Sequence, residues 1–193
     1  MIRLSQNEIA MKPIYVHLAE GFEEIEAITI IDVLRRAGLN VITVSVTENN
    51  VVTGSHKIPV RADILFKDAD YEQAEMIILP GGMPGAKNLS EHKELNNQIL
   101  NFFKQGKLLG AICAAPMVLG NLGILKGKNV VCYPGFESYL EGANVKQASV
   151  VKDGKIITGR GPGVALQFAL EIVNLLKDEG TALKLKKSMV VEV

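Results

Sequence analysis

The chain has 193 residues, of which 48% are hydrophobic and 22% charged, and its formal net charge at pH 7 is zero. This composition is typical of a globular protein and excludes a largely disordered chain. Without an excess of Lys and Arg, the sequence offers no support for a nucleic acid or a membrane surface as a partner, and no apolar run approaches the roughly 20 residues of a membrane-spanning helix.

Two cysteines are too few for a disulfide framework, and no cluster of His and Cys has the spacing of metal ligands. The sequence therefore predicts a reducing, cytoplasmic setting and no bound metal. The N-terminus lacks the apolar centre of a secretion signal, so residues 1–11 are expected to be a disordered leader. Residues 12–193 contain no repeat or linker and are expected to form a single domain.

Apolar and amphipathic segments alternate along the chain, which indicates a mostly parallel sheet with helices on both faces. Strands are predicted at 14–18, 41–46, 76–79, 108–112 and 130–132, and short extended pieces lie between 51 and 65. Helices are predicted at 24–37, 93–104, 114–122 and 164–177, followed by a basic tail. In the first helix, the spacing predicts one apolar face made of Ile25, Ile28, Ile31 and Leu34. Asp153-Gly154 is a strong signal for a two-residue hairpin turn.

Cys113 stands where a buried strand runs directly into a helix, with small residues on both sides in Leu109-Gly110-Ala111-Ile112-Cys113-Ala114-Ala115-Pro116. Such a sharp turn tolerates only small neighbours, and it aims a nucleophile outward at the carboxyl end of the sheet, where open α/β proteins bind ligands. The positive end of the following helix should lower the pKa of the thiol. The local sequence leaves a buried structural cysteine open as the alternative.

Two other segments carry candidate site residues. Leu79-Pro80-Gly81-Gly82-Met83-Pro84-Gly85 follows a strand, and its glycines let the backbone turn N–H groups into a cleft, as an oxyanion hole requires, although a tight turn explains the loop equally well. Four glutamates lie in Ala19-Glu20-Gly21-Phe22-Glu23-Glu24-Ile25-Glu26 at the start of the first helix. Helix capping explains most of them, and their spacing does not show which one points into the cleft.

Taken together and in this order, these segments resemble the DJ-1/ThiJ/PfpI superfamily and, within it, the DJ-1-like branch. The resemblance runs from about Lys12 to the end of the chain. It rests on Leu18-Ala19-Glu20-Gly21-Phe22-Glu23-Glu24-Ile25-Glu26, Leu79-Pro80-Gly81-Gly82, Ala111-Ile112-Cys113-Ala114-Ala115-Pro116 and Gly159-Arg160-Gly161-Pro162-Gly163. It implies a flavodoxin-like three-layer sandwich, as in class I glutamine amidotransferases, and a homodimer that uses the first helix.

The resemblance also implies the composition of the site. Cys113 would be the nucleophile and Glu26 its carboxylate partner, without a cofactor or a metal. The backbone N–H groups of the oxyanion pocket would come from Gly82 and Ala114. The nearby pocket residues would be Gly81, Cys132 and Tyr133. A protonated Glu26 can donate a hydrogen bond to a thiolate or a sulfinate, whereas an ionised Glu26 raises the pKa of the thiol.

The chain departs from the family pattern at Tyr133, where better-known members carry a histidine directly before a proline. Tyrosine is a poor general base near neutral pH, which argues against a protease or a triad hydrolase. The three histidines, His17, His56 and His92, are expected to be structural or solvated. Cys132 is either a buried strand cysteine or a thiol that captures an oxidised Cys113.

These features predict a cysteine-dependent stress-response protein that handles oxidants or reactive carbonyls through Cys113. Two alternatives stay open, namely a cofactor-free glyoxalase or protein deglycase acting on methylglyoxal or its adducts, and a non-enzymatic redox sensor or chaperone. The expected partners are a second copy of the chain and small reactive carbonyls or peroxide, with neither nucleic acid nor membrane.

Overall fold

The computed structural model describes residues 11–191, so all but the last residue of the predicted leader at 1–11 lies outside the described residues. Seven strands form the central sheet in the order β10-β11-β7-β6-β1-β2-β5. Their bounds are β1 Ile14–Leu18, β2 Val41–Ser45, β5 Ile64–Leu65, β6 Met76–Leu79, β7 Leu108–Ile112, β10 Val150–Asp153 and β11 Ile156–Gly159. Every pairing is parallel except that of β10 with β11. The predicted mostly parallel sheet is confirmed.

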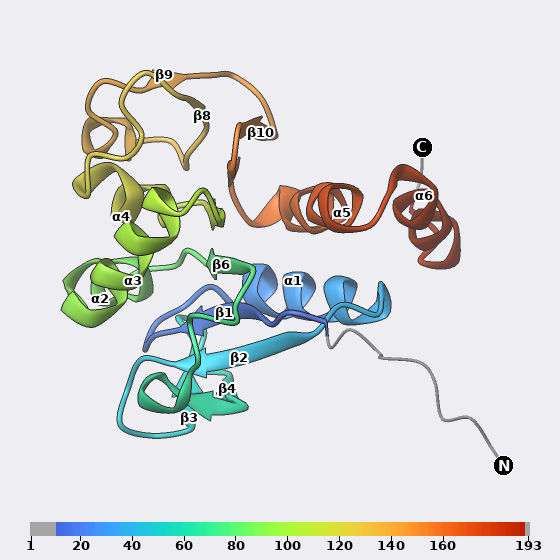
Figure 1. Ribbon diagram of the computed structural model, residues 1–193, viewed down its shortest axis with the longest axis horizontal. Coiled ribbons are helices and arrows are strands. Elements are labelled where there is room, and N and C mark those ends of the chain that lie inside the picture. The colour runs from blue at the N-terminus through green and yellow to red at the C-terminus, as the bar shows by residue number, and fades with distance from the viewer. Residues whose placement is uncertain (1–10, 192–193) are drawn as a thin grey trace, which may run out of the picture.

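Helices cover the sheet on both faces and complete a three-layer sandwich (Figure 1). Their bounds are α1 Glu24–Arg36, α2 Gly85–Glu91, α3 Lys93–Lys104, α4 Pro116–Asn121, α5 Ala165–Leu176 and α6 Glu179–Ser188. Helices α1 and α5 pack side by side, whereas α3 packs on β6 and β7 and contacts α2, which in turn contacts α4. None of the helices within 11–191 has the length and apolar character needed to cross a membrane.

Two small sheets lie outside the central one. The antiparallel pair is β3 Val51–Thr53 with β4 Pro59–Arg61, and the parallel pair is β8 Asn129–Val130 with β9 Asn144–Val145. Short 3-10 turns occupy Phe66–Asp68, Glu137–Tyr139 and Pro162–Val164. These pieces matter for the site because the loop between β3 and β4 reaches the start of α1, and the segment after β8 reaches the end of β7.

The buried face of α1 is rotated relative to the predicted one. Ile25 and Ile28 are 58% and 43% exposed, whereas Glu26, Ile30 and Leu34 are fully buried. Residues four apart share one side of a helix, so the same rotation that buries Ile30 and Leu34 turns Glu26 inward. Of the predicted face, Ile31 and Leu34 are buried as expected, but Ile25 and Ile28 are not, and Glu26 and Ile30 lie on the buried side instead.

Other boundaries also differ from the predictions. Asp153 pairs with Ile156, so the hairpin turn lies at Gly154 and Lys155, one residue later than expected. The Asp153 carboxylate accepts the N–H of Asn129 at 2.8 Å, and this bond holds Asp153 at the strand end. The helices α2 and α6 were not predicted, and the basic tail is in fact α6. Its first turn is capped by Asp178, whose carboxylate accepts a backbone N–H at 2.7 Å.

Candidate active site

Cys113 occupies a sharp turn directly after β7. Its φ of 64° lies in the left-handed region, which is rare for a residue with a side chain. Two backbone hydrogen bonds hold this conformation: the Cys113 N–H donates to the Gly159 carbonyl at 2.9 Å, and the Tyr133 N–H donates to the Cys113 carbonyl at 2.8 Å. Neighbouring loops on both sides thus fix the thiol at the carboxyl end of the sheet, in the arrangement expected of a nucleophile elbow.

Glu26 is the glutamate that the structure brings to Cys113. Its carboxyl oxygen Oε2 accepts the Gly81 N–H at 2.7 Å, and the carboxyl lies beside the Cys113 thiol. Burial raises the pKa of Glu26 to about 7, although the contacts with Cys113 and with the Gly81 N–H act in the opposite direction, and the nearby Glu23 adds to the rise. A carboxyl group with this pKa can hold or release a proton near neutral pH.

Gly81 allows the carboxyl and the thiol to meet. A Cβ atom at this position would lie 2.8 Å from Glu26 Oε2 and 2.7 Å from the Cβ of Cys113, so any side chain would push the two groups apart. The sequence placed Gly81 only among the nearby pocket residues. Its role as the hydrogen-bond donor to Glu26 became visible once the turn after β6 and the inner face of α1 were placed together.

The expected lowering of the Cys113 pKa is contradicted. Burial is the largest effect and raises the pKa of the thiol, and the adjacent Glu26 raises it further. The helix that was expected to favour the thiolate begins only at Pro116 and has six residues, so its dipole is weak at the sulfur. The resting state is therefore a neutral thiol next to a carboxyl group, and the two titrate as a pair.

Two backbone N–H groups act on the sulfur in the opposite sense. Those of Gly82 and Ala114 both lower the pKa of Cys113, because they face the sulfur and favour negative charge on it. Gly82 has a φ of 85°, a left-handed conformation that favours glycine, and a Cβ there would overlap the backbone of Phe22 and Glu23. The pair of donors is arranged as an oxyanion pocket requires.

Tyr133 and Cys132 lie on the other side of the turn. The half-exposed ring of Tyr133 covers Gly161, where a Cβ would come within 3.2 Å of the ring. Cys132 is buried, and burial together with Glu137 raises its pKa to about 11, although Arg160 partly opposes this. Both cysteines are free thiols. A neutral Cys132 is a weak nucleophile in the resting protein, so its capture of an oxidised Cys113 stays a prediction.

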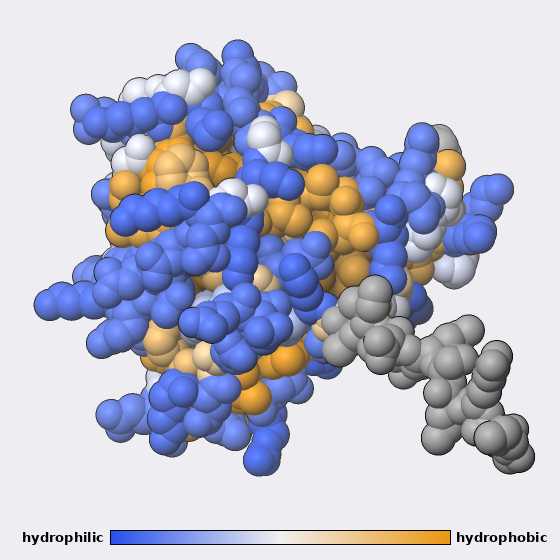
Figure 2. Space-filling view, viewed as in Figure 1, coloured by the Kyte–Doolittle hydropathy of each residue, from blue (hydrophilic) through white to orange (hydrophobic). Residues whose placement is uncertain are grey.

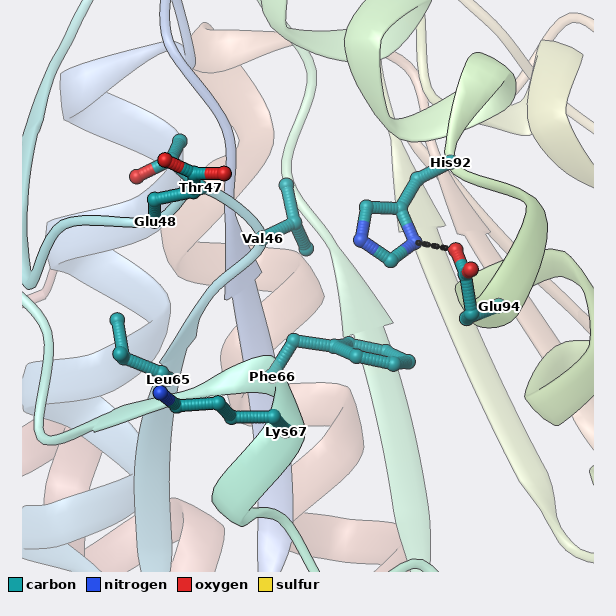
Figure 3. A pocket seen from close by; sticks show the side chains of 8 residues that line it. All are labelled: Val46, Thr47, Glu48, Leu65, Phe66, Lys67, His92 and Glu94. Atoms are coloured by element: carbon teal, nitrogen blue, oxygen red, sulfur yellow. Dashed lines mark ion pairs between the residues drawn. The ribbon is translucent and has the colours of Figure 1, made fainter.

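The histidines have roles away from Cys113. His17 is fully buried and shares a hydrogen bond of 2.7 Å with the Tyr71 hydroxyl, and burial lowers its pKa to about 3, so it stays neutral. His92 caps α3 by accepting a backbone N–H at its Nδ1 atom. It also lines a cavity of about 700 Å³ with Phe66 and Lys67 (Figure 3), which neither Cys113 nor Glu26 reaches. His56 lies beside the first residues of α1.

The chain is similar to known proteins over most of its length. The model of the DJ-1/PfpI family matches residues 12–175. Protein DJ-1 homologs B and A of Arabidopsis thaliana are 38% and 37% identical over 92% and 86% of the chain, but the chain spans only 41% and 43% of their lengths. The Glutathione-independent glyoxalase DJR-1.2 of Caenorhabditis elegans is 36% identical over 82% of this chain and 84% of that protein. The structure of oxidized Toxoplasma gondii DJ-1 is 36% identical, with a TM-score of 0.90 over 94% of this chain and 99% of the other.

Proposed function

The chain belongs to the DJ-1/PfpI family, and from this premise we propose that it is a cysteine-dependent DJ-1-like stress protein that handles oxidants or reactive carbonyls through Cys113. The observation that carries the proposal is the buried Glu26 carboxyl beside the Cys113 thiol, with the N–H groups of Gly82 and Ala114 facing the sulfur. This arrangement provides a nucleophile, a group that takes up its proton, and donors for the negative charge that develops.

Toward a peroxide, the sulfur attacks one peroxide oxygen, so that an S–O bond forms as the O–O bond breaks. Glu26 accepts the thiol proton and passes it to the departing hydroxide, which leaves as water, and Cys113 becomes a sulfenic acid. A second peroxide yields the sulfinate. Its oxygens would accept hydrogen bonds from the Gly82 and Ala114 N–H groups and from a protonated Glu26.

Toward an α-oxoaldehyde such as methylglyoxal, the sulfur adds to the aldehyde carbon, and Glu26 takes the thiol proton and delivers it to the aldehyde oxygen, which gives a hemithioacetal. Moving one proton from that carbon to its neighbour, and the hydroxyl proton to the neighbouring carbonyl oxygen, forms a thioester, and water then releases lactate and the free thiol. This glyoxalase activity is the second candidate function. It is favoured by the pKa of Glu26 near 7, and the name of the Caenorhabditis elegans relative points the same way.

Methylglyoxal turnover is expected to be slow because Tyr133 stands where relatives place a histidine, and Glu26 must then handle two protons. General acid–base assistance contributes about 10²–10⁴-fold, so Tyr133→His is expected to raise kcat by up to that order. Tyr133→Phe is the matched control, because it keeps the ring over Gly161 and supplies no base. Lactate formation measures the effect. Fast turnover in the wild-type protein that Tyr133→His does not improve would contradict the limiting role of this position.

We also propose that the protein is cytoplasmic and that it forms a homodimer. The dimer would bury the outer face of α1. Ile25 and Ile28 are exposed on this helix, and apolar side chains gather over the region of α1 and α5 (Figure 2). Light scattering is expected to give about twice the chain mass of 20.9 kDa, and Ile28→Lys is expected to shift it toward the monomer. Phe103→Lys, at an exposed apolar residue on α3, is the control and should leave the mass unchanged. A wild-type mass near 20.9 kDa would rule the dimer out.

A further inference from the structure

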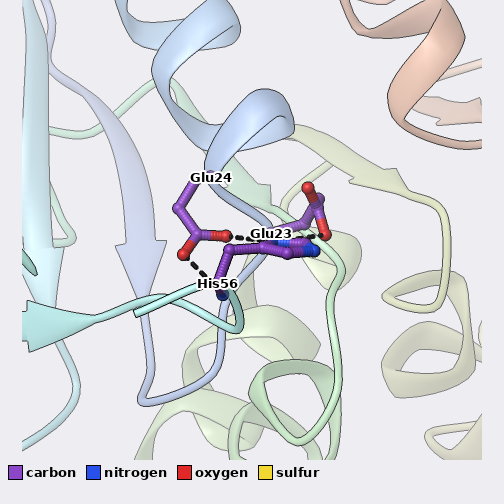
Figure 4. A group of neighbouring side chains, drawn as sticks. All are labelled: Glu23, Glu24 and His56. Carbon is purple, nitrogen blue, oxygen red and sulfur yellow. Dashed lines mark hydrogen bonds and ion pairs between the residues drawn. The ribbon is translucent and has the colours of Figure 1, made fainter. Parts of the chain in front are cut away.

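Glu23, Glu24 and His56 meet at the start of α1 (Figure 4). The glutamates come from the end of the loop before α1 and from its first residue, whereas His56 comes from the loop between β3 and β4. One ligand atom from each lies within 4.8 Å of the other two. His56 Nδ1 is 2.9 Å from Glu24 Oε2 and 3.7 Å from Glu23 Oε2. More than 30 residues separate the two segments, so the spacing of these residues in the sequence predicts no metal site, and none was expected.

The Ser55 hydroxyl is the fourth polar atom at this point. It lies 3.4 Å from Glu23 Oε2, 3.3 Å from Glu24 Oε2 and 3.1 Å from His56 Nδ1. Around a tetrahedral Zn²⁺ with bonds of about 2.0–2.1 Å, neighbouring ligand atoms are roughly 3.3 Å apart. The five distances given above, from His56 Nδ1 to the two carboxylates and from the Ser55 hydroxyl to the other three atoms, range from 2.9 to 3.7 Å and lie around this value. One cation at the centre of these atoms would therefore reach all four with small adjustments.

The charge of the cluster independently favours a cation. The side chains of Glu23 and Glu24 are only 13% and 7% exposed, yet within residues 11–191 His56 is the one basic group that pairs with either. Even with His56 protonated, the cluster keeps one net negative charge, because the N–H groups of His56 and Ile58 that also donate to Glu24 Oε1, at 2.7 and 3.4 Å, carry no net charge. The side chain of His56 is 67% exposed, so an ion can reach the cluster from solvent.

We propose that Glu23, Glu24 and His56, with Ser55 as the fourth group, form a Zn²⁺ site that ties the β3–β4 loop to the start of α1. His56 would bind through Nδ1 and keep its proton on Nε2. An imidazole and two carboxylates in a four-atom cage suit Zn²⁺, whereas Ca²⁺ and Mg²⁺ require six or more oxygen ligands, including waters. The site is separate from Glu26, which points to Cys113.

The test uses the full-length protein and titrates Zn²⁺ by calorimetry, with Co²⁺ as the spectroscopic probe. We expect one ion per chain, and visible Co²⁺ bands of four-coordinate geometry without thiolate charge transfer. His56→Ala and Glu23→Gln are each expected to weaken Zn²⁺ binding at least about tenfold. At known metal sites, even the loss of a residue that only hydrogen-bonds to a ligand has an effect of this size. Zn²⁺ should also raise the Tm of the wild-type protein but not that of His56→Ala.

Glu94→Gln is the matched control. Glu94 also faces a histidine, with its carboxylate 3.6 Å from His92 Nδ1, but no second carboxylate completes that pair. The Glu94→Gln variant should therefore bind Zn²⁺ with the affinity of the wild-type protein. Unchanged affinity in both Glu23→Gln and His56→Ala would overturn the proposal, as would the absence of wild-type binding at 100 µM Zn²⁺ or so. A thiolate charge-transfer band in the Co²⁺ spectrum that disappears in Cys113→Ser would assign the ion to the cysteine, and this result would also overturn the proposal.

Discussion

Replacing Cys113 with serine is expected to reduce peroxide consumption and methylglyoxal turnover to the uncatalysed background. Serine keeps the shape of the side chain, but its hydroxyl is far less acidic than a thiol, and no histidine contacts this position to activate it. Intact-protein mass after graded peroxide and lactate formation from methylglyoxal measure the two activities. The loss should be complete because the proposed chemistry of both passes through the same sulfur.

Cys132→Ser is the matched control for this experiment. Cys132 is the other buried thiol of the chain, and its pKa is raised to about 11. The variant is expected to keep turnover and the first oxidation step. If Cys132 captures the sulfenic acid, the variant will accumulate sulfinate where the wild-type protein forms a disulfide. Equal oxidation of Cys113→Ser and the wild-type protein would place the reactive thiol elsewhere.

Glu26→Gln is expected to lower methylglyoxal turnover by about 10²–10⁴-fold, the usual contribution of a general acid–base group. Glutamine keeps the size of the side chain and can still accept the Gly81 N–H, but it cannot take up a proton. Wild-type turnover should rise as the pH passes about 7, where Glu26 ionises, and the variant should lose this inflection. A kcat profile that is identical in both proteins would exclude Glu26 as the proton acceptor.

The same variant is expected to be more stable than the wild-type protein at alkaline pH. The pKa of Glu26 is about 7 in the folded protein and roughly 4.3 in an unfolded chain. At a pH between these two pKa values, Glu26 holds a proton in the folded state that it has lost in the unfolded state. The free energy of unfolding therefore falls as the pH rises. Above pH 7 the buried carboxylate therefore destabilises the fold, and Glu26→Gln removes this cost, which is on the order of 1–3 kcal/mol.

Urea unfolding at pH 5 and pH 8, in EDTA to exclude bound metal, measures the difference. The gain from Glu26→Gln should be small at pH 5 and larger at pH 8. A gain of equal size at both pH values would attribute the effect to packing rather than to the ionisation of Glu26.

The fold was largely readable from the sequence because the central strands are continuous apolar runs, as buried parallel strands must be. The elbow at Cys113 was readable because small residues surround it. The pKa of Cys113 could not be predicted, because the direction of its shift depends on burial and on which glutamate lies against the sulfur. The rotation of α1 about its axis decides which glutamate this is. The sequence does not fix that rotation, because the apolar spacing of α1 equally suits a buried face that contains Ile25 and Ile28. The cluster around His56 depends on contacts between distant segments, which spacing cannot show.

The limited exposure of Cys113 has a consequence for the size of its reaction partners. Only 8% of the residue is open to solvent, since the loops after β6, β8 and β11 crowd around the turn. A free aldehyde or a peroxide can enter such a narrow opening whole. A glycated lysine on a folded protein would have to extend its adduct to the sulfur on a thin, fully stretched side chain, and a flat protein surface could not approach at all. If Cys113 is the reactive group as proposed, we therefore expect diffusible metabolites rather than modified macromolecules to be its targets.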